Sequence, residues 1–282
     1  MKKQIALIVG FVLGAAAPAS AQTLFSDTLA SDLTQWSASP TWQGDGTLNF
    51  VASPASLGYA VATPVQQNVG YTAEDNAGRT LTAYSAPATS SWTAQVDVHL
   101  ASFSGLTQAQ YVNLNLVVVK ATDFNNYNAV LALDRYYAGP SNPVTQDFDS
   151  YATTGGSETS LGEIVNATTD ATLAISFDSA NNRLIYAYDS DGSAGGYSFV
   201  QAYTVDISGW NMTGQNFGFA LIGGSGSDLT NLYGPVVSAT DAYFTNFKVT
   251  DGVVSVVPEP ASYAAILAAL VLGLAVRRRL SA

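Results

Sequence analysis

Carboxylates and a single histidine are the groups of this sequence best suited to chemistry, because the chain contains no cysteine. Without cysteine, zinc–thiolate centres, iron–sulfur clusters and cysteine nucleophiles are excluded. His99 is the only histidine, so a Ser-His-Asp triad would have to use it, yet the chain has no Gly-x-Ser-x-Gly nucleophile elbow. In the alternating segment 92–100 it points to the same side as Asp97. We therefore predict a surface strand position for His99 and no catalytic residues.

A short acidic motif is a candidate for calcium binding. Asp189-Ser190-Asp191-Gly192-Ser193 resembles the start of a calcium loop, because Ca²⁺ prefers several oxygen ligands. The later carboxylate of an EF-hand is missing, and Asp-Gly also forms ordinary hairpin turns. Asp147 and Asp149 form a second acidic pair, to which the same caution applies. Apart from calcium at Asp189 and Asp191, we expect no metal and no cofactor.

Aromatic side chains could bind a sugar by stacking on its face. We assign most of them to the core, since aromatic residues dominate the packing of β-sandwiches. Tyr136 and Tyr137 are adjacent, so they point to opposite faces of one strand and one of them should face solvent. These two tyrosines are the candidate glycan contacts.

The body of the chain is strongly acidic. The chain has 10 basic and 21 acidic residues in total. Two lysines at the start and three arginines at the end leave five basic residues against 20 acids before Glu259, a net charge of about −15. Such a field repels nucleic acid and anionic lipid, so we expect no nucleic-acid partner. Neutral glycans, or anionic polymers bridged by a divalent cation, are compatible with it.

The elements that position these residues are all β-strands. Short alternating segments rich in Val, Leu and Tyr are separated by Gly, Asn, Asp and Ser, which predicts a sandwich or barrel. The predicted strands are 92–100, 112–120, 127–133, 173–177, 183–188, 217–222 and 243–249. Clusters at 153–157, 190–196 and 223–228 are predicted loops.

The two ends of this body resemble concanavalin-like jelly-roll domains. Phe25-Ser26-Asp27 with Trp36, followed by the segment 44–48, is similar to their first strands. The segment 242–249 is similar to their last strand, which returns to pair beside the first. The resemblance implies an all-β fold class with one concanavalin-like (jelly-roll) β-sandwich over residues 22–250.

The same resemblance brings an enzymatic alternative. Concanavalin-like domains include glycoside hydrolases with a Glu-x-Asp-x-(x)-Glu strand, in which one carboxylate is the nucleophile and another the acid, about 5 Å apart. Glu158 and Glu163 have roughly this spacing but no central aspartate, and we assign both to a solvated loop. A polysaccharide-acting enzyme, hydrolase or lyase-like, would be marked by a cluster of acids on one concave face.

The N-terminus resembles a secretory signal peptide over residues 1–21. Lys2 and Lys3 precede an uncharged apolar run at 5–17, and Ala19 and Ala21 are the small residues before a cleavage site. Cleavage would leave Gln22 as the mature N-terminus. The expected partners are the Sec-type export machinery and signal peptidase.

The C-terminus carries a proline-flanked glutamate, an apolar segment and a basic cluster, in that order. Val257-Pro258-Glu259-Pro260 precedes the apolar residues 261–276, and Arg277, Arg278 and Arg279 follow. We predict a transmembrane helix at 261–276, somewhat short for a bilayer that takes about 20 residues. The arginines would stay on the cytoplasmic side and stop the membrane segment. The alternative is a plain tail anchor without processing.

This tail resembles the PEP-CTERM sorting signal of Gram-negative bacteria. The resemblance covers 257–282 and implies an exosortase at the inner membrane as partner, processing near Pro258, and release to the cell envelope or extracellular matrix. Residues 251–256 would be the linker to the sorting signal. We therefore expect a non-enzymatic surface protein that is structural or binds a glycan such as an exopolysaccharide.

Overall fold

The computed structural model describes residues 21–256, except for 31–32, 44–47, 53–55, 65, 67–73, 104–105, 108, 138–143, 194–195 and 230–231. The predicted signal helix with Ala19, the sorting motif 257–260, the membrane segment 261–276 and the arginines 277–279 lie outside these residues. Within the described part, no helix is long and apolar enough to span a membrane.

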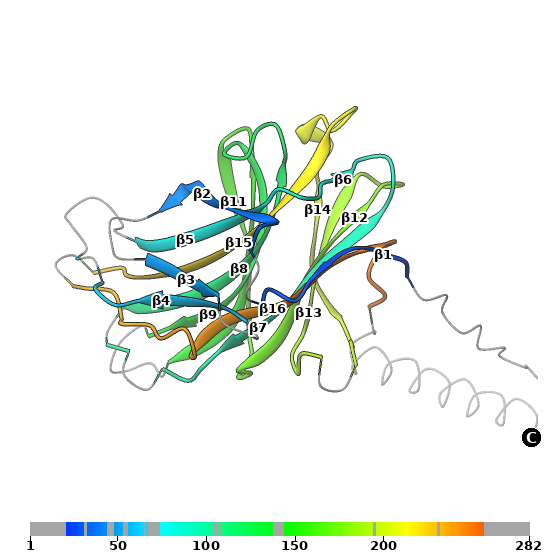
Figure 1. Cartoon of the computed structure of the whole chain (residues 1–282). Helices are drawn as coiled ribbons and strands as arrows, with labels where there is room; N and C mark the ends of the chain where they lie inside the picture. The colour runs from blue at the N-terminus through cyan, green and yellow to red at the C-terminus, as the bar shows by residue number, and fades with distance from the viewer. Residues whose placement is uncertain are drawn as a thin grey trace, which may run out of the picture.

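Two antiparallel sheets pack face to face, and their strands run in roughly similar directions (Figure 1). Sheet A has the order β14 (Val200–Asp206), β13 (Arg183–Asp189), β12 (Asp170–Asp178), β7 (Trp92–Leu100), β16 (Ala242–Asp251), β4 (Leu57–Val61) and β3 (Leu48–Ala52), and β1 (Thr23–Asp27) also pairs with β16. Sheet B has the order β11 (Ser157–Val165), β10 (Thr145–Thr154), β9 (Tyr127–Tyr136), β8 (Gln110–Lys120), β15 (Asn216–Ser227), β5 (Glu74–Leu81) and β2 (Trp36–Gln43), and β6 (Ala86–Pro87) also pairs with β15. The predicted all-β sandwich is confirmed.

Alternation along the strands builds the core between the sheets. Trp92, Val96 and Leu100 of β7 face the core, whereas Asp97 and His99 face away, as predicted from the sequence. The Trp92 ring packs on aromatic rings from both sheets, with centroids 6.0 Å from Phe177, 4.9 Å from Phe217 and 5.2 Å from Phe219. Each such ring buries about 150–250 Å², so these contacts stabilise the sandwich strongly.

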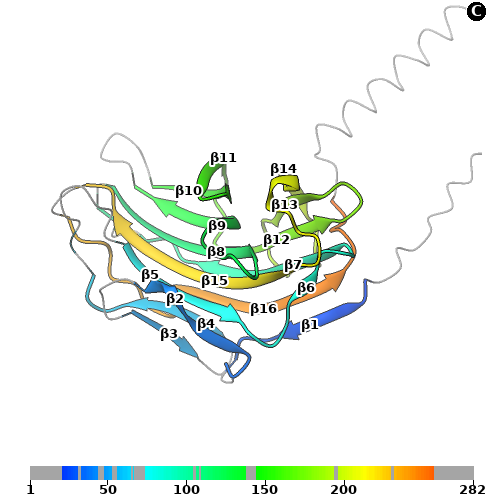
Figure 2. The ribbon, with the colours of Figure 1, turned by 90° about the horizontal axis from the view of Figure 1, so that it is seen from above.

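The chain ends of the body meet as the sequence predicts. β1 pairs antiparallel with β16, the last strand, and Figure 2 shows the two running side by side. Asp27 accepts hydrogen bonds from the Trp36 indole N–H at 2.9 Å and from the Leu29 backbone N–H at 2.8 Å. The motif around Phe25 and Trp36 thus fixes the first strand onto the sandwich.

Three local predictions need correction. Strands β4, β5, β6, β10, β11 and β14 were not predicted, and Glu158 and Glu163 lie on β11 rather than in a loop. The predicted loop 223–228 is the end of β15, whose glycines tolerate dense cross-strand packing. Of the predicted loop 153–157, only the centre lies outside the strands, as a turn at Gly155 and Gly156, which both have positive φ. Local composition suggested loops where long-range pairing formed strands.

Residues 252–256 follow β16 and stay in contact with sheet A. The Gly252 backbone N–H donates to the Ser91 carbonyl at 3.0 Å, and the Val254 N–H donates to Ser176 Oγ at 3.1 Å. Val254 and Val256 pack on a small apolar cluster that includes Phe199. This part of the predicted linker therefore contributes to the packing of the body.

Candidate functional site

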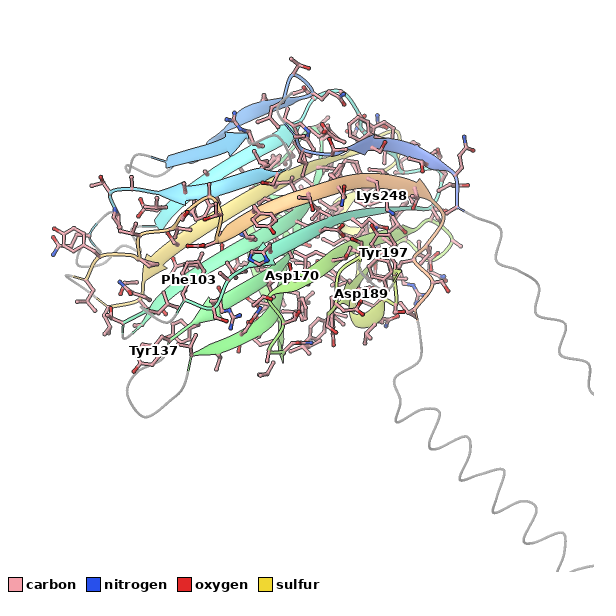
Figure 3. The ribbon with its side chains drawn as sticks, turned by 60° about the horizontal axis from the view of Figure 1, so that its bottom comes forward. Phe103, Tyr137, Asp170, Asp189, Tyr197 and Lys248 are labelled. Carbon is pink, nitrogen blue, oxygen red and sulfur yellow. The ribbon has the colours of Figure 1, made fainter. Side chains whose placement is uncertain are left out.

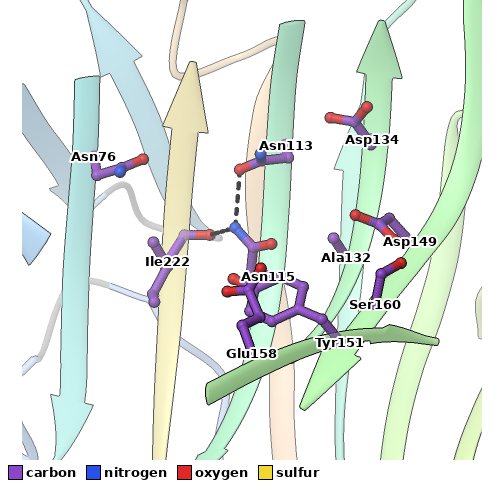
Figure 4. Close-up of a pocket in the computed structure, with 10 residues that line it drawn as sticks. All are labelled: Asn76, Asn113, Asn115, Ala132, Asp134, Asp149, Tyr151, Glu158, Ser160 and Ile222. Atoms are coloured by element: carbon purple, nitrogen blue, oxygen red, sulfur yellow. Dashed lines mark hydrogen bonds between the residues drawn. The ribbon is translucent and has the colours of Figure 1, made fainter. Parts of the chain in front are cut away.

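A polar groove crosses the outer face of sheet B, which is the face turned away from the core (Figure 4). It consists of two adjoining cavities of about 380 Å³ and 450 Å³, which share Asn113, Asp134 and Asp149. These residues alternate along β8, β9 and β10 with core residues such as Leu114 and Leu133. Strand alternation therefore separates a polar surface from an apolar interior on the same three strands.

Two glycines of β15, Gly224 and Gly226, have no side chain that would fill the floor of the groove. A Cβ at Gly224 would lie 2.5 Å from Asn113 Oδ1 and 2.6 Å from Asn76 Oδ1, which is closer than real atoms approach. A Cβ at Gly226 would lie 2.7 Å from the Tyr111 hydroxyl. The two glycines of β15 thus let the side chains of β5 and β8 lie across the sheet.

A pair of asparagines is fixed on this floor (Figure 4). The Asn115 amide donates to Asn113 Oδ1 at 2.9 Å and to the Ile222 carbonyl at 3.1 Å. Because Asn115 is buried, these bonds hold its amide in one orientation. Such preorganised amides can hydrogen-bond a polar ligand without first being ordered.

Two pairs of carboxylates form one wall of the groove. Asp147 lies directly across from Asp134 of β9, and Asp149 lies directly across from Glu163 of β11. Residues that face each other in this way have Cβ atoms about 4.5–5.5 Å apart, and like charges at this distance destabilise a sheet. The sandwich therefore holds several carboxyl groups close together here.

The carboxylates hold protons more tightly than ordinary ones. Burial, followed by the charges of Glu163 and Asp149, raises the pKa of Asp147 to about 7. Burial and the charges of Asp147, Asp149 and Glu163 raise the pKa of Asp134 well above its ordinary value. The pKa of Asp149 is also raised by burial, although the Ser150 backbone N–H partly offsets this.

A β-bulge brings Glu158 into the same groove. Glu158 and Glu163 are an odd number of residues apart, so a regular strand would point them to opposite faces. The register shifts between Ser150 and Tyr151, where Gly162 with a φ of 129° forms part of the bulge on β11. Glu158 and Glu163 therefore both line the groove.

Tyrosines stand at both ends of the groove. Tyr136, one of the two candidate glycan contacts, pairs across the strands with Tyr111, and its hydroxyl hydrogen-bonds Asp228. Tyr151 lines the opposite end beside Ile222. Tyr137, the other candidate, directly follows β9 of sheet B and is partly buried against the core. The structure thus places Tyr136 in the groove and Tyr137 outside it.

The histidine lies on the outer face of sheet A, on the other side of the sandwich. His99 Nδ1 is 2.7 Å from Asp170 Oδ1, and its ring stacks on Tyr243 with centroids 4.7 Å apart. Asp170 is labelled in Figure 3. These contacts fit the predicted surface strand position.

The calcium candidate, Asp189 and Asp191, lies where β13 ends, in a loop held by hydrogen bonds to the Asp189 carboxylate. Asp189 is 2% exposed, and its carboxylate accepts the backbone N–H groups of Asp191 at 3.4 Å and Ser198 at 2.5 Å. Its oxygens therefore hold the end of β13 to the segment before β14, close to Tyr197 and Lys248 in Figure 3. Lys248 Nζ lies 4.0 Å from the centroid of the Tyr197 ring. In the described ranges, no three His, Asp or Glu side chains are gathered to hold a metal ion.

Sequence reasoning did not identify the groove, although one signal of it was present. Asp147 and Asp149 are two residues apart, which on a strand places both on one face. Their neighbours Asp134 and Glu163 come from other strands. Only the pairing register brings these four together.

No family model matches the chain, and no curated protein matches it. Solved structures match over most of its length. The CBM2 module of the evolved Dit of Lactobacillus casei BL23 phage J-1 is 10% identical, covers 83% of this chain and 98% of its own, and has a TM-score of 0.52. Lectin II from Ulex europaeus is 8% identical over 81% of this chain and 98% of its own, with a TM-score of 0.50. A galactose complex of lectin UEA-II is 10% identical over 82% of this chain and 100% of its own, also with a TM-score of 0.50. At such low identity the likeness concerns the fold alone: the chain has a β-sandwich like those of these structures.

Proposed function

We propose that this protein binds a glycan in the groove on the outer face of sheet B and does not act on it as an enzyme. The observation that carries the proposal is the combination of tyrosines at both ends with fixed amides on the floor. Tyrosine rings offer apolar faces for sugar rings, and Asn113 and Asn115 offer amide groups for sugar hydroxyls. An open groove across several strands suits a polymer better than a small isolated ligand.

The fold comparisons support this proposal by analogy. The matching structures named above are described as a carbohydrate-binding module, a lectin and a lectin complexed with galactose. Function resides in sites rather than in folds, so the groove itself has to bind the glycan.

A glycan array followed by calorimetry tests the proposal. We expect the full-length protein to bind at least one polysaccharide, and Tyr136→Ala to weaken binding about 2- to 12-fold, because a stacking contact contributes about 0.5–1.5 kcal/mol. Tyr243→Ala is the matched control, since this tyrosine lies on the outer face of sheet A. Equal affinities of both variants, or no binding to any glycan, would contradict the proposal.

A glycoside hydrolase is the second candidate, and the raised pKa of Asp147 favours it. A protonated carboxyl beside an ionised one is the arrangement of a catalytic acid and its partner. Asp147, with a pKa of about 7, would be the acid, and Asp149 or Glu163 the second carboxylate. Release of reducing ends that is lost in Asp147→Asn would establish the enzyme. A bound polysaccharide that stays intact after prolonged incubation would exclude hydrolysis of that glycan.

We also propose that the protein is exported and sorted to the cell envelope or extracellular matrix through an exosortase. The support is the sequence alone: the signal-like residues 1–21, the Val257–Pro260 motif, the apolar segment and the terminal arginines. A protease that reads the motif needs Pro258, Glu259 and Pro260, whereas a plain anchor needs only apolar length and positive charge.

Intact mass measurement in the native host separates these two possibilities. We expect the mature wild-type protein to begin at Gln22 and to lack the terminal arginines. Replacement of the three motif residues by alanine should trap the tail-bearing protein in the inner membrane. A mature wild-type protein that keeps Arg277–Arg279 would refute processing and leave only an anchor.

A further inference from the structure

The groove offers negative charge with no basic side chain to balance it. Six acidic residues line its two cavities: Asp134, Asp147, Asp149, Glu158, Glu163 and Asp228. None of the basic residues in the described ranges lines it. Lys120 donates to the Trp210 carbonyl, Lys248 lies over Tyr197, and Arg183 pairs with Asp178. A cationic ligand could supply positive charge that these side chains do not provide.

Asp147 is the carboxylate that most needs such a ligand. It is 5% exposed, lines the groove, and has no hydrogen-bond partner among the residues that the structure describes. Asp134 and Asp149, by contrast, each accept a backbone N–H from the next residue. The Asp147 side chain is largely buried but borders the groove, so a donor that enters the groove can bond a carboxylate that has no hydrogen-bond partner in the described part of the fold.

The spacing of the carboxylates suits a chain of separate positive charges better than one metal ion. Ca²⁺ requires several oxygens at about 2.3–2.6 Å around a single point. Here the acids form two cross-strand pairs, and successive pairs along β10 are about 7 Å apart. An ammonium group needs fewer ligands, because its three N–H donors can bond one or two carboxylates and a neighbouring amide.

We propose that the groove binds a glycan that carries free amino groups, with an ammonium group of the sugar chain held against Asp147. This inference rests on the proposed glycan-binding function and specifies its ligand class. The tyrosines contact the faces of the sugar rings, and the carboxylate pairs hold the amino substituents. N-acetylation of the amines removes both the charge and two of the three N–H donors.

Titration calorimetry of the full-length protein at near-neutral pH tests this inference. The probes are a glucosamine oligomer with free amines, its fully N-acetylated counterpart, an acidic uronic-acid oligomer, and calcium chloride alone. We expect the free-amine oligomer to bind at least 10-fold more tightly than the N-acetylated one, with affinity falling as salt is added. The uronic-acid oligomer should not bind.

Variants connect the binding to Asp147. Asp147→Asn should weaken binding of the free-amine oligomer about 10-fold while leaving any binding of the N-acetylated oligomer unchanged. Asp251→Asn, on an exposed residue at the end of β16, is the control that removes a carboxylate outside the groove. Equal loss in both variants would mean that only overall charge matters, and the inference would be wrong.

The outcomes separate this inference from the function on which it rests. Equal affinity for free-amine and N-acetylated oligomers would overturn the amino-sugar inference and leave glycan binding intact. Calcium binding that Asp147→Asn abolishes would make the groove a metal site and also overturn it. Absence of binding to these oligomers and to every glycan of the array would overturn both.

Discussion

Asparagine at position 147 removes a carboxylate with a raised pKa from the groove while keeping the shape of the side chain. In the folded protein, burial and the charges of Glu163 and Asp149 raise the pKa of Asp147 to about 7, against an ordinary value of 3.8. The folded state therefore binds this proton more tightly than the unfolded state. Consequently, Asp147 makes the protein less stable as the pH rises from about 4 to about 7, and the loss is complete above that window.

The magnitude follows from the two pKa values. Each unit of difference corresponds to about 1.4 kcal/mol, so the interval from 3.8 to about 7 corresponds to about 4 kcal/mol. The groove is open to water, which screens the charges, and the neighbouring carboxylates can take up the proton instead. We therefore expect roughly half of this value, about 2 kcal/mol, as the gain in unfolding free energy of Asp147→Asn at slightly alkaline pH.

Urea unfolding at two pH values measures the effect. Asp147→Asn should exceed wild type by about 2 kcal/mol near pH 8 and by almost nothing near pH 4, where the folded wild type already carries the proton. Asp251→Asn, which removes an exposed charge far from the groove, should show no such pH-dependent gain. A variant that is no more stable than wild type near pH 8, or equally stabilised at both pH values, would refute the reasoning.

The other predictions concern packing and the extent of the body. Gly223→Ala should lower the unfolding free energy by about 1–3 kcal/mol in urea, because its Cβ would collide with the Tyr59 ring, and a loss below 0.5 kcal/mol would contradict this packing. Gly224→Ala should weaken glycan binding in calorimetry by displacing the two asparagine side chains beside it, and unchanged affinity would place the ligand elsewhere. A fragment spanning Gln22–Val256 should melt cooperatively by circular dichroism. A fragment that ends at Thr250 should melt at a lower temperature, because it lacks the segment packed on sheet A, and equal melting temperatures would show that this segment adds no stability.

The sequence by itself was sufficient for the fold class and for the facing of several strands. A period of two along 92–100 placed Val96 and Val98 inside and His99 outside, because the pleat of a strand sends successive side chains to opposite faces. The similarity of the first and last segments to a jelly roll anticipated that β1 pairs with β16. These features are local, or depend on motifs at the chain ends, so they could be identified without coordinates.

Only the tertiary structure determined which residues line the groove. Asp147 and Asp149 share a face by their spacing, but their partners Asp134 and Glu163 are set by the register of three strands. Glu158 reaches that face only because a bulge shifts the register of β11. Register depends on long-range pairing and on burial of the opposite face in the sandwich core, and no local pattern encodes either. The glycine-rich end of β15 was predicted as a loop, but strand pairing makes it part of the sheet, where it forms the floor of the groove.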